Sequence, residues 1–150
     1  MADAFLRPAR AADLPGLTAL MRAAYALYLP RMDRQPAPMA QDFAPEIAAG
    51  RVHIAGPATA PTAATVWEQA PDHLFLHAIA VAPSAQGRGL GRAITSWAEA
   101  RALDAGTPEV RLYTNAIMVE NIAFYRALGY RETHRGRRDG FDRRWFAKQL

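Results

Sequence analysis

A predicted strand, a glycine-rich loop and a predicted helix, joined in that order over residues 74–104, constrain the fold more than any other part of the chain. The loop reads Gln86-Gly87-Arg88-Gly89-Leu90-Gly91-Arg92 and opens the helix. The first N–H groups of a helix have no internal partner, and the helix dipole places partial positive charge at that end. Three glycines let a ligand approach the backbone closely, and Arg88 and Arg92 add positive charge. The stretch therefore predicts a binding site for a phosphate-bearing anion.

Two common phosphate-binding loops do not fit this spacing. The dinucleotide-binding fingerprint requires a glycine at its sixth position, which is Arg92 when the count starts at Gly87. The nucleoside-triphosphate loop requires a lysine before Ser or Thr, and the one lysine of the chain is Lys148. What remains is Gln-x-x-Gly-x-Gly after a strand that ends Ile-Ala-Val-x-Pro. This pattern resembles the acyl-coenzyme A loop of the Gcn5-related N-acetyltransferase (GNAT) family, and a tight strand-to-helix turn without a ligand is the alternative.

The predicted order of elements extends this resemblance over the whole chain. Residues 31–45 contain three prolines and are predicted to form a bent loop rather than a packed element. The order β-α-α-β-β-β-α-β-α-β-β is that of the GNAT family. It implies a single N-acetyltransferase domain over residues 1–150, of the α/β class, with a mixed, mostly antiparallel central sheet, a splayed parallel pair and about four flanking helices. Strands are predicted at 5–7, 51–55, 62–67, 74–81, 110–114, 130–137 and 141–148, and helices at 14–29, 46–49, 90–102 and 119–128.

A second motif, the run from Asn121 through Tyr125 to Gly129 and Tyr130, resembles the family's other cofactor segment. In many members the tyrosine of that segment lies beside the thioester sulfur and donates a proton to the departing thiolate. The resemblance gives this catalytic role to Tyr125, and an ordinary half-buried helix aromatic is the alternative. A phenol with a pKa of about 10 can assist a thiolate whose thiol has a pKa of about 8.5. The family's usual asparagine position falls at Met118, and Asn121 lies one helical turn later, on the same face as Tyr125.

The resemblance also implies contacts from the backbone of the central strand. In the family the pantetheine arm pairs with this strand as an added strand would, and a backbone N–H there can polarise the thioester carbonyl. The cofactor-binding residues that the resemblance implies are Ile79, Ala80, Val81, Gln86, Gly87, Arg88, Gly89, Leu90, Gly91, Arg92, Asn121 and Tyr125.

Acetyl transfer to an amine also needs a general base, because a lysine-type amine is neutral in only about one molecule per 10³ at pH 7. His77 lies on the predicted central strand, at a position where related family members often carry a glutamate, and it is our catalytic candidate. Because Ile79 and Val81 share its strand parity, a histidine packed in the core is the alternative. Further candidates for the base are Glu68, Asp72 and Glu120.

Composition restricts the class of protein further. The chain has 150 residues, of which 51% are hydrophobic, and it has no cysteine, which excludes disulfides, thiolate metal sites and cysteine nucleophiles. No apolar run reaches the roughly 18 residues of a membrane span, and residues 1–3 show no signal-peptide pattern. We therefore expect a cytoplasmic protein with no membrane partner and no metal.

The net charge of +4 comes almost wholly from arginine, which suits either an anionic cofactor or nucleic acid. The densest cluster surrounds an Asp-Gly pair at 139–140, which predicts the turn of a β-hairpin. We interpret this cluster as a solvated hairpin rather than as a nucleic-acid-binding surface. Its members are Arg135, Arg137, Arg138, Arg143 and Arg144.

Together these features predict an N-acetyltransferase that takes its acetyl group from acetyl-CoA. The acceptor is predicted to be a primary amine of unidentified class, which attacks the thioester directly in a ternary complex. The resemblance implies that the loop between the first two helices and the final hairpin form walls of the acceptor site. Two alternatives stay open: a non-catalytic acyl-CoA-binding protein, and a nucleic-acid-binding domain that depends on the hairpin arginines. A homodimer through the last strands also stays open, although no motif indicates it.

Overall fold

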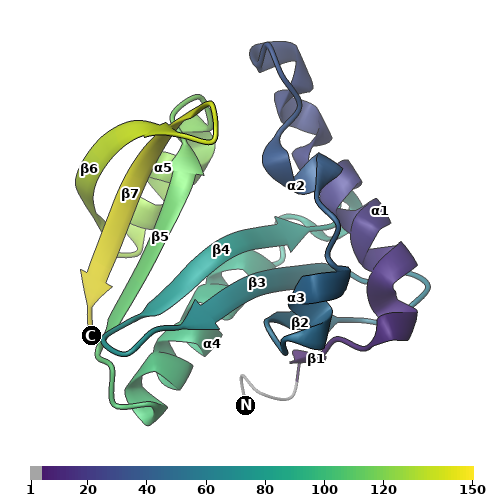
Figure 1. Cartoon of the computed structure of the whole chain (residues 1–150), viewed down its shortest axis with the longest axis horizontal. Coiled ribbons are helices and arrows are strands. Elements are labelled where there is room, and N and C mark those ends of the chain that lie inside the picture. The colour runs from purple at the N-terminus through teal and green to yellow at the C-terminus, as the bar shows by residue number, and fades with distance from the viewer. Residues whose placement is uncertain (1–4) are drawn as a thin grey trace. The chain divides into compact units, whose positions relative to one another are not determined.

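Within residues 5–150, which the computed structural model describes, seven strands form one sheet in the order β1-β2-β3-β4-β5-β7-β6 (Figure 1). β4 and β5 run parallel, whereas the pairs β1/β2, β2/β3, β5/β7 and β6/β7 are antiparallel. The predicted mixed, mostly antiparallel sheet with one parallel pair is therefore confirmed. The strands are β1 Arg7–Pro8, β2 Val52–Ala55, β3 Ala63–Gln69, β4 Leu74–Val81, β5 Glu109–Asn115, β6 Arg131–Arg138 and β7 Phe141–Gln149.

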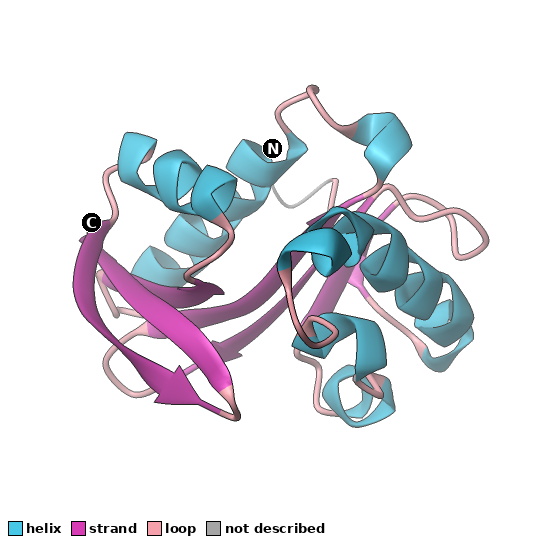
Figure 2. Cartoon of the chain, turned by 90° about the horizontal axis from the view of Figure 1, so that it is seen from above, coloured by secondary structure: helices cyan, strands magenta, loops and turns pink. Residues whose placement is uncertain are grey.

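Five α-helices accompany these strands in the described part of the chain, one more than the sequence predicts (Figure 2). The additional helix, α2, lies in the segment predicted to be a bent loop, so that prediction is wrong. Pro38 lies in the first turn of α2, where a proline costs no hydrogen bond, and Met39 is buried. The first helix also ends earlier than predicted, because Ala26–Arg31 continues it as a 3-10 helix. The helices are α1 Leu14–Tyr25, α2 Ala37–Ala40, α3 Ala44–Ala48, α4 Leu90–Asp104 and α5 Val119–Ala127.

The chain forms two compact units, which are described separately below. The N-terminal unit comprises Met1–Trp67 and Ala78–Trp97, and the C-terminal unit comprises Glu68–His77 and Ala98–Leu150. Residues 1–3, where the sequence shows no signal-peptide pattern, lie outside the described residues. No helix in residues 5–150 has both the length and the apolar character needed to cross a membrane.

The core of the N-terminal unit lies between α1 and the sheet. Leu17 and Met21 recur at helical spacing on α1 and are fully buried. They belong to one cluster with alternate residues of β2, Val52 and Ile54, together with Phe43. The stripe that the sequence predicts on this helix is therefore its packing face.

A buried histidine also belongs to the N-terminal unit. The Trp67 indole Nε1 donates a hydrogen bond of 3.0 Å to Nδ1 of His53, and the ring centroid of Trp97 lies 4.7 Å from that of His53. Because its buried ring nitrogen has a donor, His53 is satisfied as a core residue.

In the C-terminal unit, β5, β7 and β6 lie side by side, with α5 against them (Figure 1). Glu99, on the second half of α4, accepts hydrogen bonds from the Tyr130 hydroxyl at 2.9 Å and from Lys148 Nζ at 3.2 Å. Burial, and then the charge of Glu99, raises the pKa of Tyr130, so this phenol stays a donor. Gly129 ends α5 with φ of +93°, which confirms the predicted helix stop.

The hairpin of β6 and β7 turns at Asp139 and Gly140, whose φ angles are +54° and +80°, as the Asp-Gly pair predicts. Arg135 pairs with Asp142 at 2.7 Å. Arg143 differs from the predicted solvated hairpin arginines, because its exposed fraction is only 8%. The prediction of a solvated side chain is therefore wrong for Arg143, since strand alternation turns it to the opposite face from Asp142.

Asp13 is a buried carboxylate of the N-terminal unit, with 1% exposure. Its two oxygens each accept a hydrogen bond of 2.8 Å from Arg7, and the Arg10 backbone N–H donates a third of 2.8 Å. These hydrogen bonds, chiefly those from Arg7, lower the pKa of Asp13 to about 2 although burial opposes them. The carboxylate thus joins β1 to the start of α1.

We expect Asp13→Asn to lower the free energy of unfolding by about 2 kcal/mol at pH 7, because a shift of one pKa unit corresponds to about 1.4 kcal/mol. A carboxylate whose pKa is lower in the folded state stabilises the fold above its unfolded pKa. This stabilisation is lost as the pH falls from about 4 toward 2. Urea denaturation of both proteins across this range should therefore show the difference between them shrinking.

The control for this prediction is Asp104→Asn, which changes an exposed carboxylate at the end of α4. It should alter the free energy of unfolding by less than about 0.5 kcal/mol. A difference between wild type and Asp13→Asn that does not change with pH would contradict the assigned role of Asp13.

Candidate functional site

The glycine-rich loop adopts a backbone conformation that favours glycine at two positions. Gly87 and Gly89 have φ angles of +81° and +78°, in the left-handed region. A Cβ added at either residue would meet no other atom within 4 Å, so the space beside the loop backbone is open. Both residues are exposed, and α4 begins at the next residue, Leu90. The loop, in the N-terminal unit, therefore presents bare backbone at a helix N-terminus.

The two arginines of the loop carry charge that the described residues do not neutralise. Arg88 and Arg92 are exposed, and neither forms an ion pair with a carboxylate of residues 5–150. Arg88 donates one hydrogen bond, of 3.4 Å, to the Ser84 carbonyl oxygen. Open space, orphan helix N–H groups and two cations fit a ligand that carries a diphosphate, as coenzyme A does.

Side chains bind the carbonyl groups on the last part of β4, where the sequence predicts backbone contacts of Ile79, Ala80 and Val81. The Tyr25 hydroxyl donates to the Ile79 carbonyl at 3.3 Å, and the Gln86 amide donates to the Val81 carbonyl at 3.4 Å. Ala80 is buried. Gln86 therefore ties the loop to the strand that precedes it, and Tyr25 is a contact of β4 that sequence reasoning missed. No local pattern could show it, since the two residues are 54 positions apart.

In the C-terminal unit, the parallel ladder of β4 and β5 ends after three pairs. Leu74, Phe75 and Leu76 pair with Val110, Arg111 and Leu112, respectively. The next residues, His77 and Tyr113, are not paired, although β5 continues to Asn115 beside β7. The predicted splay of the parallel pair therefore begins at His77.

The second motif lies on α5 in the C-terminal unit. Tyr125 is buried, with ring centroids 5.2 Å from Phe124 and 5.9 Å from Tyr130. Asn121 is half-buried in the first turn of the helix, and its amide donates to the Met118 sulfur at 3.7 Å. Met118, at the usual asparagine position of the family, is thus a partner of Asn121. The two motif residues keep the helical spacing that the sequence predicts.

His77 lies next to Glu68, which the sequence analysis gives only as an alternative candidate for the general base. Its Nε2 lies 3.2 Å from Oε1 of Glu68, and both side chains are partly exposed. His77 is therefore not a packed core histidine. The pairing of two titratable groups is the arrangement that a proton acceptor needs. Sequence reasoning missed it because residues on two strands meet only when the strands pair.

Asp72 and Glu120 have less suitable surroundings than His77. Asp72 contacts His73 Nδ1 at 2.7 Å and Arg111 at 3.6 Å, within a polar network. The hydrogen bond from His73, and then the charges of His73 and Arg111, lower the pKa of Asp72, which makes it a weaker base. Glu120 is exposed in the first turn of α5.

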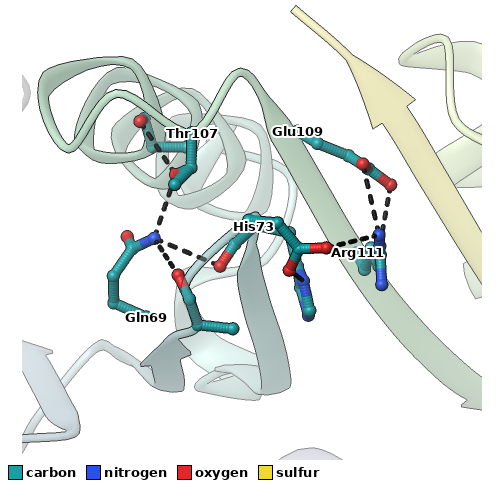
Figure 3. A network of polar contacts seen from close by, with 8 residues as sticks. Gln69, His73, Thr107, Glu109 and Arg111 are labelled. Carbon is teal, nitrogen blue, oxygen red and sulfur yellow. Dashed lines mark hydrogen bonds and ion pairs between the residues drawn. The ribbon is translucent and has the colours of Figure 1, made fainter.

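The same network has a structural role at the turn between β3 and β4. Gln69 Nε2 donates to the His73 carbonyl at 3.1 Å and to Thr107 Oγ1 at 2.9 Å, and Glu109 accepts from Arg111 at 2.7 Å (Figure 3). These contacts satisfy the polar groups of the turn. Among residues 5–150, no group of three or more His, Asp or Glu side chains gathers closely enough to hold a metal ion.

Comparison with known families and structures gives consistent results. The model of the Acetyltransferase (GNAT) family matches residues 47–130, which is more than half of the chain. The PaiA N-acetyltransferase of Thermoplasma acidophilum, solved in complex with coenzyme A, is similar with a TM-score of 0.81 and 16% identity over 97% of this chain and 98% of that one. The ribosomal-protein-S18-alanine N-acetyltransferase of Escherichia coli is similar with a TM-score of 0.71 and 21% identity, over 96% and 92%.

A third solved structure, Naa50 of Arabidopsis thaliana with the bisubstrate analogue CoA-Ac-MVNAL, has a TM-score of 0.70 and 17% identity, with 97% of both chains covered. At these identities the likeness shows the fold. No curated protein matches the sequence.

We expect Gly89→Glu to weaken the binding of coenzyme A by at least about tenfold, because it puts bulk and negative charge at the helix N-terminus. Isothermal titration calorimetry with coenzyme A measures the change. Gly50→Glu is a matched control, because Gly50 has φ of +74° and equally open surroundings in another turn. It carries the same backbone strain and the same charge, so equal weakening by both variants would contradict a specific role of the loop.

Proposed function

Because the chain belongs to the acetyltransferase (GNAT) family, and so transfers an acetyl group from acetyl-CoA, we propose that it acetylates a primary amine by direct attack of the amine on the thioester. The observation that carries this proposal is the exposed loop of Gly87 and Gly89, whose two arginines form no ion pair with a carboxylate of residues 5–150. The chain has no cysteine, so no side-chain thiol can take the acetyl group first. This favours one transfer step in a ternary complex.

We propose that the loop holds the diphosphate of the donor through the first N–H groups of α4 and through Arg88 and Arg92. Gln86 would hold the loop against β4 through its 3.4 Å hydrogen bond to Val81. Acetyl-CoA supplies an activated acyl carbon when it is bound. The chain's own residues then have three tasks: to position that carbon, to take a proton from the amine and to protonate the thiolate.

His77 is the residue that we propose takes the proton from the acceptor ammonium. Glu68, at 3.2 Å from the imidazole Nε2, would orient the ring and stabilise the imidazolium that forms. The neutral amine then forms the N–C bond while the C–S bond breaks, and the nitrogen of the product loses its second proton to solvent. The exposure of both side chains leaves the pair accessible to a substrate.

Tyr125 is the residue that we propose protonates the departing thiolate. The motif resemblance supports this role, as does its rigid surrounding of Phe124 and Tyr130, since a buried ring with two aromatic neighbours has few alternative rotamers. The phenol would return to the neutral form by taking a proton from solvent after coenzyme A leaves.

The proposed function is tested by following thiol release from acetyl-CoA with a panel of primary amines. We expect turnover by the wild type, and a decrease in kcat of about 10² to 10⁴ for Tyr125→Phe if the phenol acts as a general acid. The dissociation constant of coenzyme A for this variant should stay within about threefold, because Phe preserves the packing. Binding of acetyl-CoA without turnover of any amine would favour a non-catalytic acyl-CoA-binding protein instead.

His77→Gln should lower kcat/KM by about 10² at pH 7, because the ammonium form of the acceptor then has no base. The loss should diminish as the pH rises toward about 10, where the amine is increasingly neutral without help. Rate–pH profiles of both proteins measure this ratio. Glu68→Gln should cause a smaller loss with the same pH trend, and a His77→Gln defect that is independent of pH would contradict the role of base.

A further inference from the structure

Arg143 is a buried arginine with an unsatisfied donor. Its side chain lies on β7 in the C-terminal unit, and its exposed fraction is 8%. The guanidinium carbon lies 4.3 Å from the centroid of the Tyr113 ring and 4.9 Å from that of Phe141. Its Nε is buried and makes no hydrogen bond. Leaving a buried charged donor unpaired is costly, so this atom needs an explanation.

The carboxylates of the hairpin form ion pairs with other arginines. Arg144 forms a two-pronged pair with Glu132, and Arg135 forms one with Asp142. Because side chains alternate along a strand, Arg144 and Asp142 face away from Arg143. Within residues 5–150, no carboxylate forms an ion pair with Arg143. The aromatic rings hold this cation without neutralising it.

Open space lies on the same face of the hairpin, opposite Arg143 on β6. Gly136 is directly opposite Arg143 in the β6/β7 register, so its missing side chain would point to the same face. A Cβ added at Gly136 would meet no atom within 4 Å. Its φ lies outside the left-handed region, so the backbone conformation does not require a glycine there. A glycine in a strand interior is consistent with the close approach of another group.

A wall of aromatic side chains continues from Arg143 along the same sheet face. Tyr113 lies across from Trp145, with ring centroids 5.9 Å apart. The Tyr113 ring centroid also lies 5.4 Å from that of Phe75 and 6.4 Å from that of His77. The registers put these residues on one face, because Tyr113 pairs with Trp145 and the β4/β5 ladder aligns Phe75 with Arg111. The Tyr113 ring therefore contacts both the proposed base, His77, and the guanidinium of Arg143.

We infer that Arg143 binds a carboxylate of the acceptor, so that the substrate class is a primary amine that also carries a carboxylate. This inference rests on the proposed function, since it names the amine that is acetylated. The amine lies at His77, the carboxylate at Arg143, and the body of the substrate along the Tyr113 ring. A guanidinium whose faces are stacked on aromatic rings keeps its edges for hydrogen bonds, and the Nε edge matches the two oxygens of a carboxylate. One unpaired cation balances a monoanionic carboxylate better than a dianionic phosphate monoester.

The kinetic test compares ω-amino acids, whose amine and carboxylate are separated by the body of the molecule, with the amines that lack only the carboxylate, such as 6-aminohexanoate with pentylamine. We expect the wild type to prefer the carboxylate-bearing member by at least about tenfold in kcat/KM, mainly through KM. Arg143→Gln should abolish the preference, and Arg143→Lys should restore part of it. Arg137→Gln, which removes a charge from the opposite face of the hairpin, is the control and should keep the preference.

Gly136→Val tests the inference even if changes at the buried Arg143 prevent folding. It leaves the arginine in place and fills the open space, and it suits a strand. The preference for the carboxylate should fall to about that of Arg143→Gln. Turnover without any preference in the wild type, or an unchanged preference in folded Arg143→Gln and Gly136→Val, would overturn the inference while leaving the proposed function intact.

A binding measurement separates failure of the inference from failure of the proposed function. Titration with 3-phenylpropionate, which has the carboxylate but no amine, should shift the ¹⁵N–¹H signal of the Arg143 Nε in the wild type and not that of Arg137. If no amine is acetylated but this shift occurs and is lost in Gly136→Val, the carboxylate site stands and the proposed function fails. The absence of the shift in the wild type would overturn the carboxylate site.

Discussion

The three-residue length of the parallel ladder between β4 and β5 is the constraint on which the chemistry of the C-terminal unit depends. Backbone N–H and C=O groups need hydrogen-bond partners. On one side, β5 pairs with β7 along its whole length. On the other side, β5 pairs with β4 only as far as Leu112. Beyond that residue the edge of β5 has the character of an unpaired strand, which is suited to an added extended chain. His77 and Tyr113, the first residues beyond the ladder, are also the residues from which the proposed acceptor site is built.

Arginine has two different uses in this protein. One set forms ion pairs that stabilise the fold, as Arg7 does with Asp13 and Arg144 with Glu132. Arg88, Arg92 and Arg143 have no carboxylate partner in the described chain and lie at exposed backbone or between aromatic rings. A cation that the fold does not neutralise attracts an anion from solution. Part of the excess of positive charge therefore comes from residues assigned to a diphosphate and to a carboxylate.

Local chemistry explains which elements the sequence predicts well. β4 has the predicted bounds because an apolar run ends at a proline turn, and the stop of α5 and the turn of the last hairpin follow from Gly129 and from the Asp-Gly pair. The short helix α2 was missed because a proline in a first helical turn resembles a proline in a loop. Met39 has a buried environment only in the folded chain. Arg143 was predicted to be solvated because arginine usually is, and the sequence does not show that Tyr113 and Phe141 enclose it.

The sequence by itself determined the glycine loop, the α/β order of elements and the class of cofactor, because these depend on residues that are neighbours along the chain. Phosphate recognition by a helix N-terminus requires only glycine, a helix start and nearby positive charge. The tertiary structure decided which residues from different strands meet: Glu68 with His77, Tyr25 with Ile79, and Tyr113 with Arg143. Such contacts depend on strand register and on which face a side chain takes, and a register shift of one residue reverses every face. For this reason the donor could be predicted from sequence, whereas the acceptor could be proposed only from the fold.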